Sequence, residues 1–240
     1  MEYDALFDTA ENKALIAICT RRMISLIGLG GIMLGIIAIV LGILTLHIWF
    51  LNIGLIILGL AMLATGIYAF RKPSLDVLLA ATVVAALIFI WGLAVALYLS
   101  WQREREYTEI PIILLITAYG FAGYYRKLGH VREHIESVQP EQIETAMRLC
   151  KELRKKDLKK NPHIIQTRDK TCRAELLDNS AFFMHRNLMR AFLASREDVC
   201  GAVRKPGSKR IEIRFRHPVG RLRYKFDRTN TAKLARWLAG

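Results

Sequence analysis

One short string in the sequence has residue types and a spacing that could do chemistry. His130 and His134 stand four residues apart, and Glu133 lies between them. On a helix such a pair shares one face, so the two imidazoles could hold Zn²⁺ while the carboxylate acts as a general base. A zinc-dependent membrane hydrolase is therefore one hypothesis. Three fixed positions are weak evidence, and no third ligand follows on a later helix. We therefore expect a solvated pair of histidines, with no metal and no cofactor.

The sequence contains no other pattern of an enzyme. It has no phosphate-binding loop of the type GxxxxGK[ST], no GxGxxG, no GxSxG and no pair of carboxylates inside an apolar segment. We therefore predict that the chain is not an enzyme and has no catalytic residues.

The charge is divided unevenly along the chain. Residues 126–240 hold 28 Lys and Arg against 13 Asp and Glu, whereas residues 1–125 hold 7 against 8. The net charge of +14 thus belongs to the second half of the chain. A basic region attached to a membrane segment meets anionic lipid headgroups as its nearest partner.

The first half contains four apolar stretches, at residues 24–46, 48–70, 75–100 and 110–125. A hydrocarbon core of roughly 30 Å needs about 20 helical residues, so we predict four transmembrane helices in residues 24–125, after an N-terminal segment at 1–23. By the positive-inside rule, both termini are then cytoplasmic. The basic pairs that give this orientation are Arg21 and Arg22, Arg71 and Lys72, and Arg126 and Lys127.

Glycines on the first two helices predict a close helix contact. Gly31 and Gly35 have GxxxG spacing, and Gly59 and Gly66 offer small residues on the second helix. Small residues allow helix backbones to approach one another in lipid. The contact could join the two helices of one chain, or it could join two copies in a homo-oligomer.

The second half begins with a basic helical linker at residues 126–162, followed by a domain at 163–240. A helix is predicted over 140–160, and its lysines could lie on an anionic surface or form a solvated face. These lysines are Lys155, Lys156, Lys159 and Lys160. Alternating residues then predict strands at 163–168, 172–177, 181–185, 188–194, 210–216 and 221–227, and a final amphipathic helix at 229–238.

The last two strands form a hairpin whose register can be derived. The turn at residues 217–220 pairs Arg216 with Arg221, Arg214 with Arg223 and Glu212 with Lys225, and it leaves apolar side chains on the other face. Like charges directly opposite one another destabilise a sheet, so we expect an anion or a nearby carboxylate to bridge the arginines. Nucleic acid is an unlikely partner, because no aromatic side chain for base stacking points out on this face.

The order of these elements resembles the bacterial pleckstrin-homology-like domains that are attached to small bacterial membrane proteins. The resemblance covers residues 163–240 and rests on the connection LASREDVCGAV, the hairpin RIEIRFRHPVGRLRYKF and the closing helix TAKLARWL. It implies an α+β domain with a curved antiparallel sheet and a C-terminal capping helix, which binds lipid or protein. The predicted strands are fewer than the seven of a full barrel.

We therefore predict a multi-pass protein of the bacterial inner membrane whose basic cytoplasmic domain binds anionic phospholipid headgroups or a protein partner. The residues expected to contact the anion are Arg214, Arg216, Arg221, Arg223, Lys225 and the four lysines of the linker helix. A structural subunit of a larger envelope or secretion complex is the alternative.

Overall fold

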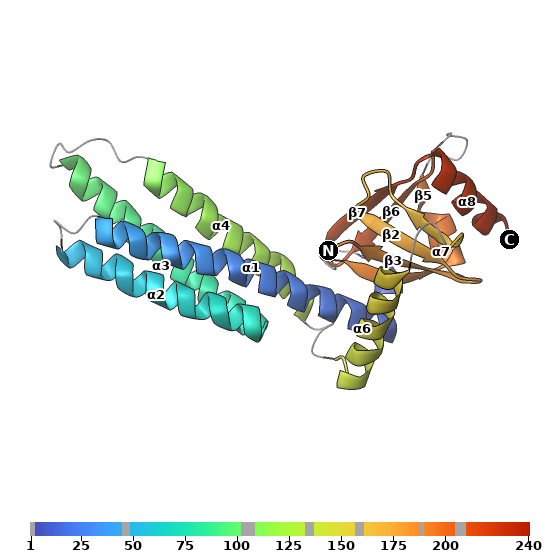
Figure 1. The fold of residues 1–240 in the computed structure, drawn as a ribbon, viewed down its shortest axis with the longest axis horizontal. Coiled ribbons are helices and arrows are strands. Elements are labelled where there is room, and N and C mark those ends of the chain that lie inside the picture. The colour runs from blue at the N-terminus through green and yellow to red at the C-terminus, as the bar shows by residue number, and fades with distance from the viewer. Residues whose placement is uncertain are drawn as a thin grey trace. The chain divides into compact units, whose positions relative to one another are not determined.

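The structure is a computed structural model that describes residues 3–44, 49–101, 109–132, 137–156, 161–187, 190–204 and 210–240 (Figure 1). The chain divides into two compact units. The helical unit is Arg21–Gly129, and the sheet domain combines Met1–Thr20 with His130–Gly240. This division differs from the expected one, because the N-terminal segment and the linker helix both belong to the sheet domain.

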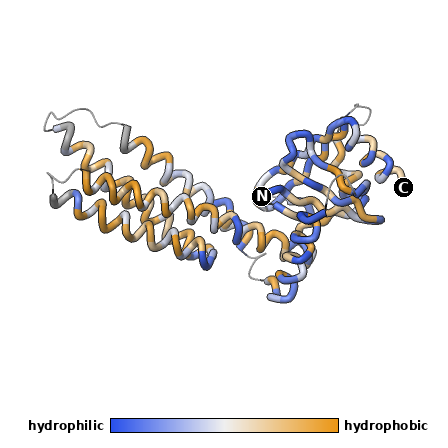
Figure 2. The backbone as a smooth tube through the Cα atoms, in the orientation of Figure 1, coloured by the Kyte–Doolittle hydropathy of each residue, from blue (hydrophilic) through white to orange (hydrophobic). Residues whose placement is uncertain are grey.

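Long helices build the helical unit. They are α1 (Ala10–Leu44), of which the unit contains the part from Arg21, α2 (Trp49–Arg71), α3 (Leu75–Trp101) and α4 (Glu109–Gly129). Figure 2 shows that these helices are apolar along most of their length. Large apolar side chains such as Ile57, Ile90 and Ile116 are more than half exposed, which is the pattern of a surface that meets lipid.

Three of these helices, namely α1, α2 and α3, are long and apolar enough to cross a membrane. Helix α1 starts at Ala10, well before the expected start at residue 24. The expected fourth span at 110–125 is also a helix, α4, but it does not meet the same standard over its described residues. The polar carboxyl-terminal part of α4, with Tyr124, Tyr125, Arg126 and Lys127, lowers its apolar character.

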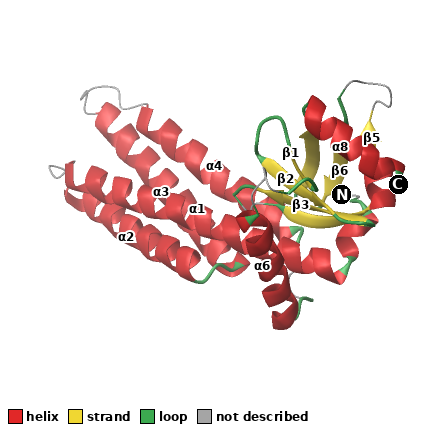
Figure 3. Ribbon diagram, turned by 45° about the vertical axis from the view of Figure 1, so that its right-hand side comes forward, coloured by secondary structure: helices red, strands yellow, loops and turns green. Residues whose placement is uncertain are grey.

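The described part of the sheet domain contains seven strands in two antiparallel sheets (Figure 3). One sheet has the order β1 (Ile164–Gln166), β2 (Cys172–Leu176), β3 (Ser180–His185) and β4 (Ala191–Ser195). The other has the order β5 (Val203–Arg204), β6 (Glu212–His217) and β7 (Gly220–Lys225). Thr167 forms an isolated bridge with Phe226, so the ends of β1 and β7 meet.

Two short helices complete this domain. Helix α7 (Arg196–Ala202) connects β4 to β5, and its N-cap Ser195 forms a capping box with Asp198. Helix α8 (Arg228–Ala239) packs beside β1 after the capping residue Asp227. The region of α7 and β5 was expected to be a simple connection, so strand β5 is a finding of the structure.

Strand β3 is buried on both faces, and this explains why its sequence does not alternate. Phe183 points into an aromatic cluster between the sheets, where its ring stacks on Phe192 at 5.0 Å and on Tyr224 at 5.5 Å between ring centroids. Phe182 and Met184 point to the other side. There they pack against α1 and against α6 (Pro140–Lys155).

Helix α6 is therefore part of the core of the domain. Its buried residues Ala146, Cys150 and Leu153 belong to the same apolar cluster as Phe182. The helix begins at Pro140 as expected and ends at Lys155, earlier than expected. A linker was expected at this position. The structure corrects that interpretation.

The N-terminal segment fills a gap in the domain. Phe7, in the short 3₁₀ helix η1 (Ala5–Asp8), is fully buried, and its ring lies edge-on to Phe192 at 5.3 Å. The amide of Asn12 acts like a strand partner for β4: its Oδ1 accepts from the Leu193 N–H at 2.7 Å, and its Nδ2 donates to the Leu193 carbonyl at 2.8 Å. The sheet domain is thus assembled from two distant parts of the chain.

Candidate functional site

The hairpin of β6 and β7 presents a row of cations on one face. Its register is the predicted one, with Arg216 opposite Arg221 and Arg214 opposite Arg223. Burial alternates as the period of a strand requires: the four arginines and Lys225 are exposed. The apolar residues between them, Ile213, Phe215, Leu222 and Tyr224, are buried.

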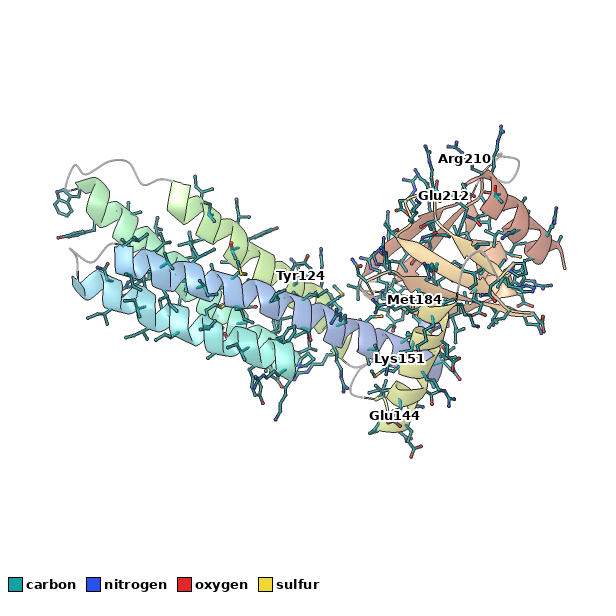
Figure 4. The ribbon with its side chains drawn as sticks, viewed as in Figure 1. Tyr124, Glu144, Lys151, Met184, Arg210 and Glu212 are labelled. Atoms are coloured by element: carbon teal, nitrogen blue, oxygen red, sulfur yellow. The ribbon has the colours of Figure 1, made fainter. Side chains whose placement is uncertain are left out.

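A carboxylate bridges two of the arginines. Glu212 Oε1 accepts a hydrogen bond from Arg214 Nε at 2.8 Å and a second from Arg223 Nε, while Arg223 Nη2 donates to Oε2 at 3.1 Å. The hydrogen bond from Arg223, followed by the bond and charge of Arg214, lowers the pKa of Glu212 to about 2. The carboxylate therefore stays ionised and offsets the repulsion within this arginine pair (Figure 4, where Glu212 is labelled).

An open groove of about 820 Å³ lies beside this row. We call it the arginine groove. Its walls are residues 4–6 of the N-terminal segment, residues 197, 198, 201 and 202 of α7, and residues 214–216 and 221–223 of the hairpin. Asp4 fixes the N-terminal wall to β6, because its Oδ2 accepts from the Arg216 N–H at 2.7 Å and its N–H donates to the Arg216 carbonyl at 3.0 Å.

Two lysines of the predicted linker helix are described, and neither lines this groove. Lys155 is exposed near the end of α6, and Lys156 forms an ion pair with Glu175 of β2. Lys159 and Lys160 lie outside the described residues. Among the described candidates, the hairpin arginines are thus the cations that gather at one defined place.

The four glycines of the predicted contact lie between α1 and α2 of one chain. A Cβ built on Gly35 would lie 2.8 Å from the Gly59 carbonyl oxygen and 2.7 Å from the Leu63 nitrogen. One built on Gly66 would lie 2.7 Å from the Ile32 nitrogen, and one on Gly31 would lie 3.1 Å from the Met62 methyl. The backbones of α1 and α2 therefore approach closely only because these side chains are missing.

The histidine string is only partly visible. His130 follows α4, whereas Glu133 and His134 lie outside the described residues. Among the residues that the structure describes, no group of three or more His, Cys, Asp or Glu could hold a metal ion. The zinc hypothesis thus gains no observation from the structure.

Two of the cysteines are poor nucleophiles. Burial raises the pKa of the Cys150 thiol to about 11 and that of the Cys172 thiol to about 12. Both side chains are protonated at neutral pH, and they serve as small apolar groups in the core.

Comparisons of the chain with known protein families, with curated proteins and with solved structures each gave no match.

Sequence reasoning missed several residues that build the groove and its support, above all Asp4, Phe7 and Asn12. A signal was present for Phe7, since a large aromatic residue in an acidic and polar N-terminal segment calls for a burial site. A signal was also present for Glu212, which the derived register places on the same face as the arginines.

Proposed function

We propose that this chain is a membrane-anchored, non-enzymatic binding protein whose sheet domain binds anionic phospholipid headgroups. The observation that carries this proposal is the exposed cation row of the hairpin, where Arg214, Arg216, Arg221 and Arg223 also line the arginine groove. Guanidinium groups recognise phosphate by paired, charge-assisted hydrogen bonds. Lys225 extends the row along β7.

We propose that the sheet domain belongs to the class of bacterial pleckstrin-homology-like domains and serves as a scaffold for a headgroup site. Antiparallel strands followed by a C-terminal helix support this proposal.

We further propose four membrane crossings with both termini in the cytoplasm, at the bacterial inner membrane. Met1–Thr20 and His130–Gly240 build one compact unit, so both parts must lie on the same side of the membrane. A chain that leaves one side and returns to it crosses an even number of times. Helices α1, α2 and α3 alone would give an odd number, and this favours α4 as the fourth crossing.

Reporter fusions test this topology. A reporter after Lys72 or Lys127 should read cytoplasmic, and one inserted within residues 103–106 should read external. An external reading after Lys127 would contradict the proposal.

The lipid test uses the full-length protein in phosphatidylcholine nanodiscs, so that the helices are surrounded by lipid while the sheet domain remains accessible. The nanodiscs should float with vesicles that contain phosphatidylglycerol and not with pure phosphatidylcholine vesicles, and binding should weaken as salt rises. Because each cation near an anionic surface contributes about 1 kcal/mol, replacing the four groove arginines by Gln should weaken binding at least about tenfold.

A matched control removes the same charge elsewhere. Arg168, Arg186, Arg228 and Arg236 are exposed on the same domain and do not line the groove. Their replacement by Gln should weaken binding much less. If the two quadruple variants lose binding equally, the attraction is general and the hairpin is not the contact surface.

A protein partner or a structural role in a larger complex is the second candidate. The glycine spacing does not favour this candidate, because the contact between α1 and α2 of one chain occupies these glycines. They are Gly31, Gly35, Gly59 and Gly66. Co-purification of a stoichiometric protein partner, with no lipid preference in the vesicle assay, would favour it.

A further inference from the structure

The arginine groove is lined by side chains of opposite charge. The hairpin contributes four arginines, whereas α7 contributes Glu197 and Asp198 and the N-terminal segment contributes Asp4. A site for a simple anion gains nothing from carboxylates, since they repel a phosphate. The acidic wall therefore calls for a separate explanation.

Arg214 and Arg223 bond to Glu212, which lies on their own sheet. Asp198 accepts hydrogen bonds from the backbone N–H and the hydroxyl of Ser195 at 3.0 and 2.6 Å. Glu197 is exposed at the first turn of α7. Glu197 and the hairpin arginines therefore line the same open groove.

The size of this space suits a small polar molecule. A volume of about 820 Å³ lies within the range of ligand pockets in proteins, which is roughly 300–1,000 Å³. A ligand that matches both walls needs an anionic group for the arginines and a cationic group for Glu197, separated by a short linker. A phosphate with a primary ammonium group has this chemistry.

We propose that the arginine groove binds the headgroup of an aminophospholipid, with its phosphate at the hairpin arginines and its ammonium at Glu197 of α7. This inference rests on the proposed function, since it names the class of lipid for the same site. It adds a role for the acidic wall, which a general attraction to anionic membranes does not use.

The test compares two lipids of equal net charge. Full-length protein in phosphatidylcholine nanodiscs is mixed with vesicles that contain phosphatidylserine or, at the same mole fraction, phosphatidylglycerol, which lacks an amine. We expect about tenfold tighter binding to phosphatidylserine, because the ammonium adds a charge-assisted hydrogen bond to a carboxylate. Phosphatidylethanolamine vesicles should also bind more tightly than phosphatidylcholine vesicles.

A conservative variant identifies the acidic wall. Glu197→Gln should remove the preference for phosphatidylserine while binding to phosphatidylglycerol stays equal or becomes stronger, which also reports that the domain is folded. Glu144→Gln, an exposed change on α6 outside the groove, should keep the preference (Figure 4 labels Glu144).

The outcomes separate the two proposals. If both anionic lipids bind equally and better than phosphatidylcholine, the headgroup inference is wrong and the proposed function stands. A preference that persists in Glu197→Gln also overturns the inference. If neither anionic lipid binds better than phosphatidylcholine, both proposals fail.

Discussion

The helical unit and the sheet domain encode their contacts in different ways. In β6, buried Ile213 and Phe215 alternate with exposed Arg214 and Arg216, so polarity alone states which way each side chain faces. The long apolar helices are apolar on both sides: on α2, Met62 is fully buried, while Ile57 is 59% exposed. Hydropathy therefore cannot identify the packed face of such a helix. The spacing of the glycines indicates instead which face packs against another helix.

The largest expected effect lies in the sheet domain and comes from its N-terminal segment. Phe7→Ala removes a fully buried ring from the aromatic cluster, and such a change costs about 3–5 kcal/mol. We expect a much lower midpoint of thermal unfolding for the sheet domain of the full-length protein in detergent, followed by circular dichroism in the strand region.

Met147→Ala is the control, because this residue of α6 is 42% exposed and should change stability only slightly. A fragment that starts at Pro140 lacks both Phe7 and Asn12 and should not reach the native fold. If that fragment unfolds at the same temperature as the sheet domain of the full-length protein, the N-terminal segment is not needed for the fold.

A smaller effect is expected at the glycine contact of the helical unit. Gly35→Val places a side chain against the backbone atoms of Gly59 and Leu63, so α1 and α2 must separate. Overpacking of this kind costs about 1–3 kcal/mol. Gly30→Val is the matched control on the same helix, since a Cβ there meets nothing within 4 Å. Thermal unfolding in detergent should show a lower midpoint for Gly35→Val than for Gly30→Val. Equal midpoints would mean that the glycine spacing does not determine how α1 and α2 pack.

The smallest effect is a dependence of stability on pH at the charged face. Glu212 has a pKa of about 2 in the folded protein, below its ordinary value of 4.5. Its contribution to stability is therefore complete above pH 4.5 and is lost as the pH falls towards 2. Because the arginines that bond to Glu212 are exposed to solvent, we expect less than about 1 kcal/mol. The difference in stability between the parent and Glu212→Gln should shrink over this pH range, whereas a constant difference would show that the charge of Glu212 is irrelevant.

The sequence predicted the hairpin, its register and the direction of the arginine row, because the side-chain period of a strand leaves no freedom once the turn is located. It could not predict the contact of Asn12 with Leu193, which joins residues 181 positions apart without any local pattern. Strand β5 was missed because two residues give no alternation. The acidic wall of the groove was missed because Glu197 and Asp198 look like an ordinary first turn of a helix.

The division of the sheet domain between two parts of the chain has a consequence for biosynthesis. Roughly 140 residues separate Thr20 from the first strand, so at about 5–20 residues per second the ribosome needs on the order of ten seconds to supply the partner of the N-terminal segment. In the proposed topology, Phe7 and Asn12 have no folded partner during that interval, while the intervening helices enter the bilayer. A chain that inserts one helix too few would leave its two ends in different compartments, where they could never meet. Folding of the sheet domain would then depend on correct membrane insertion, since only a chain with both ends on the same side can complete the domain.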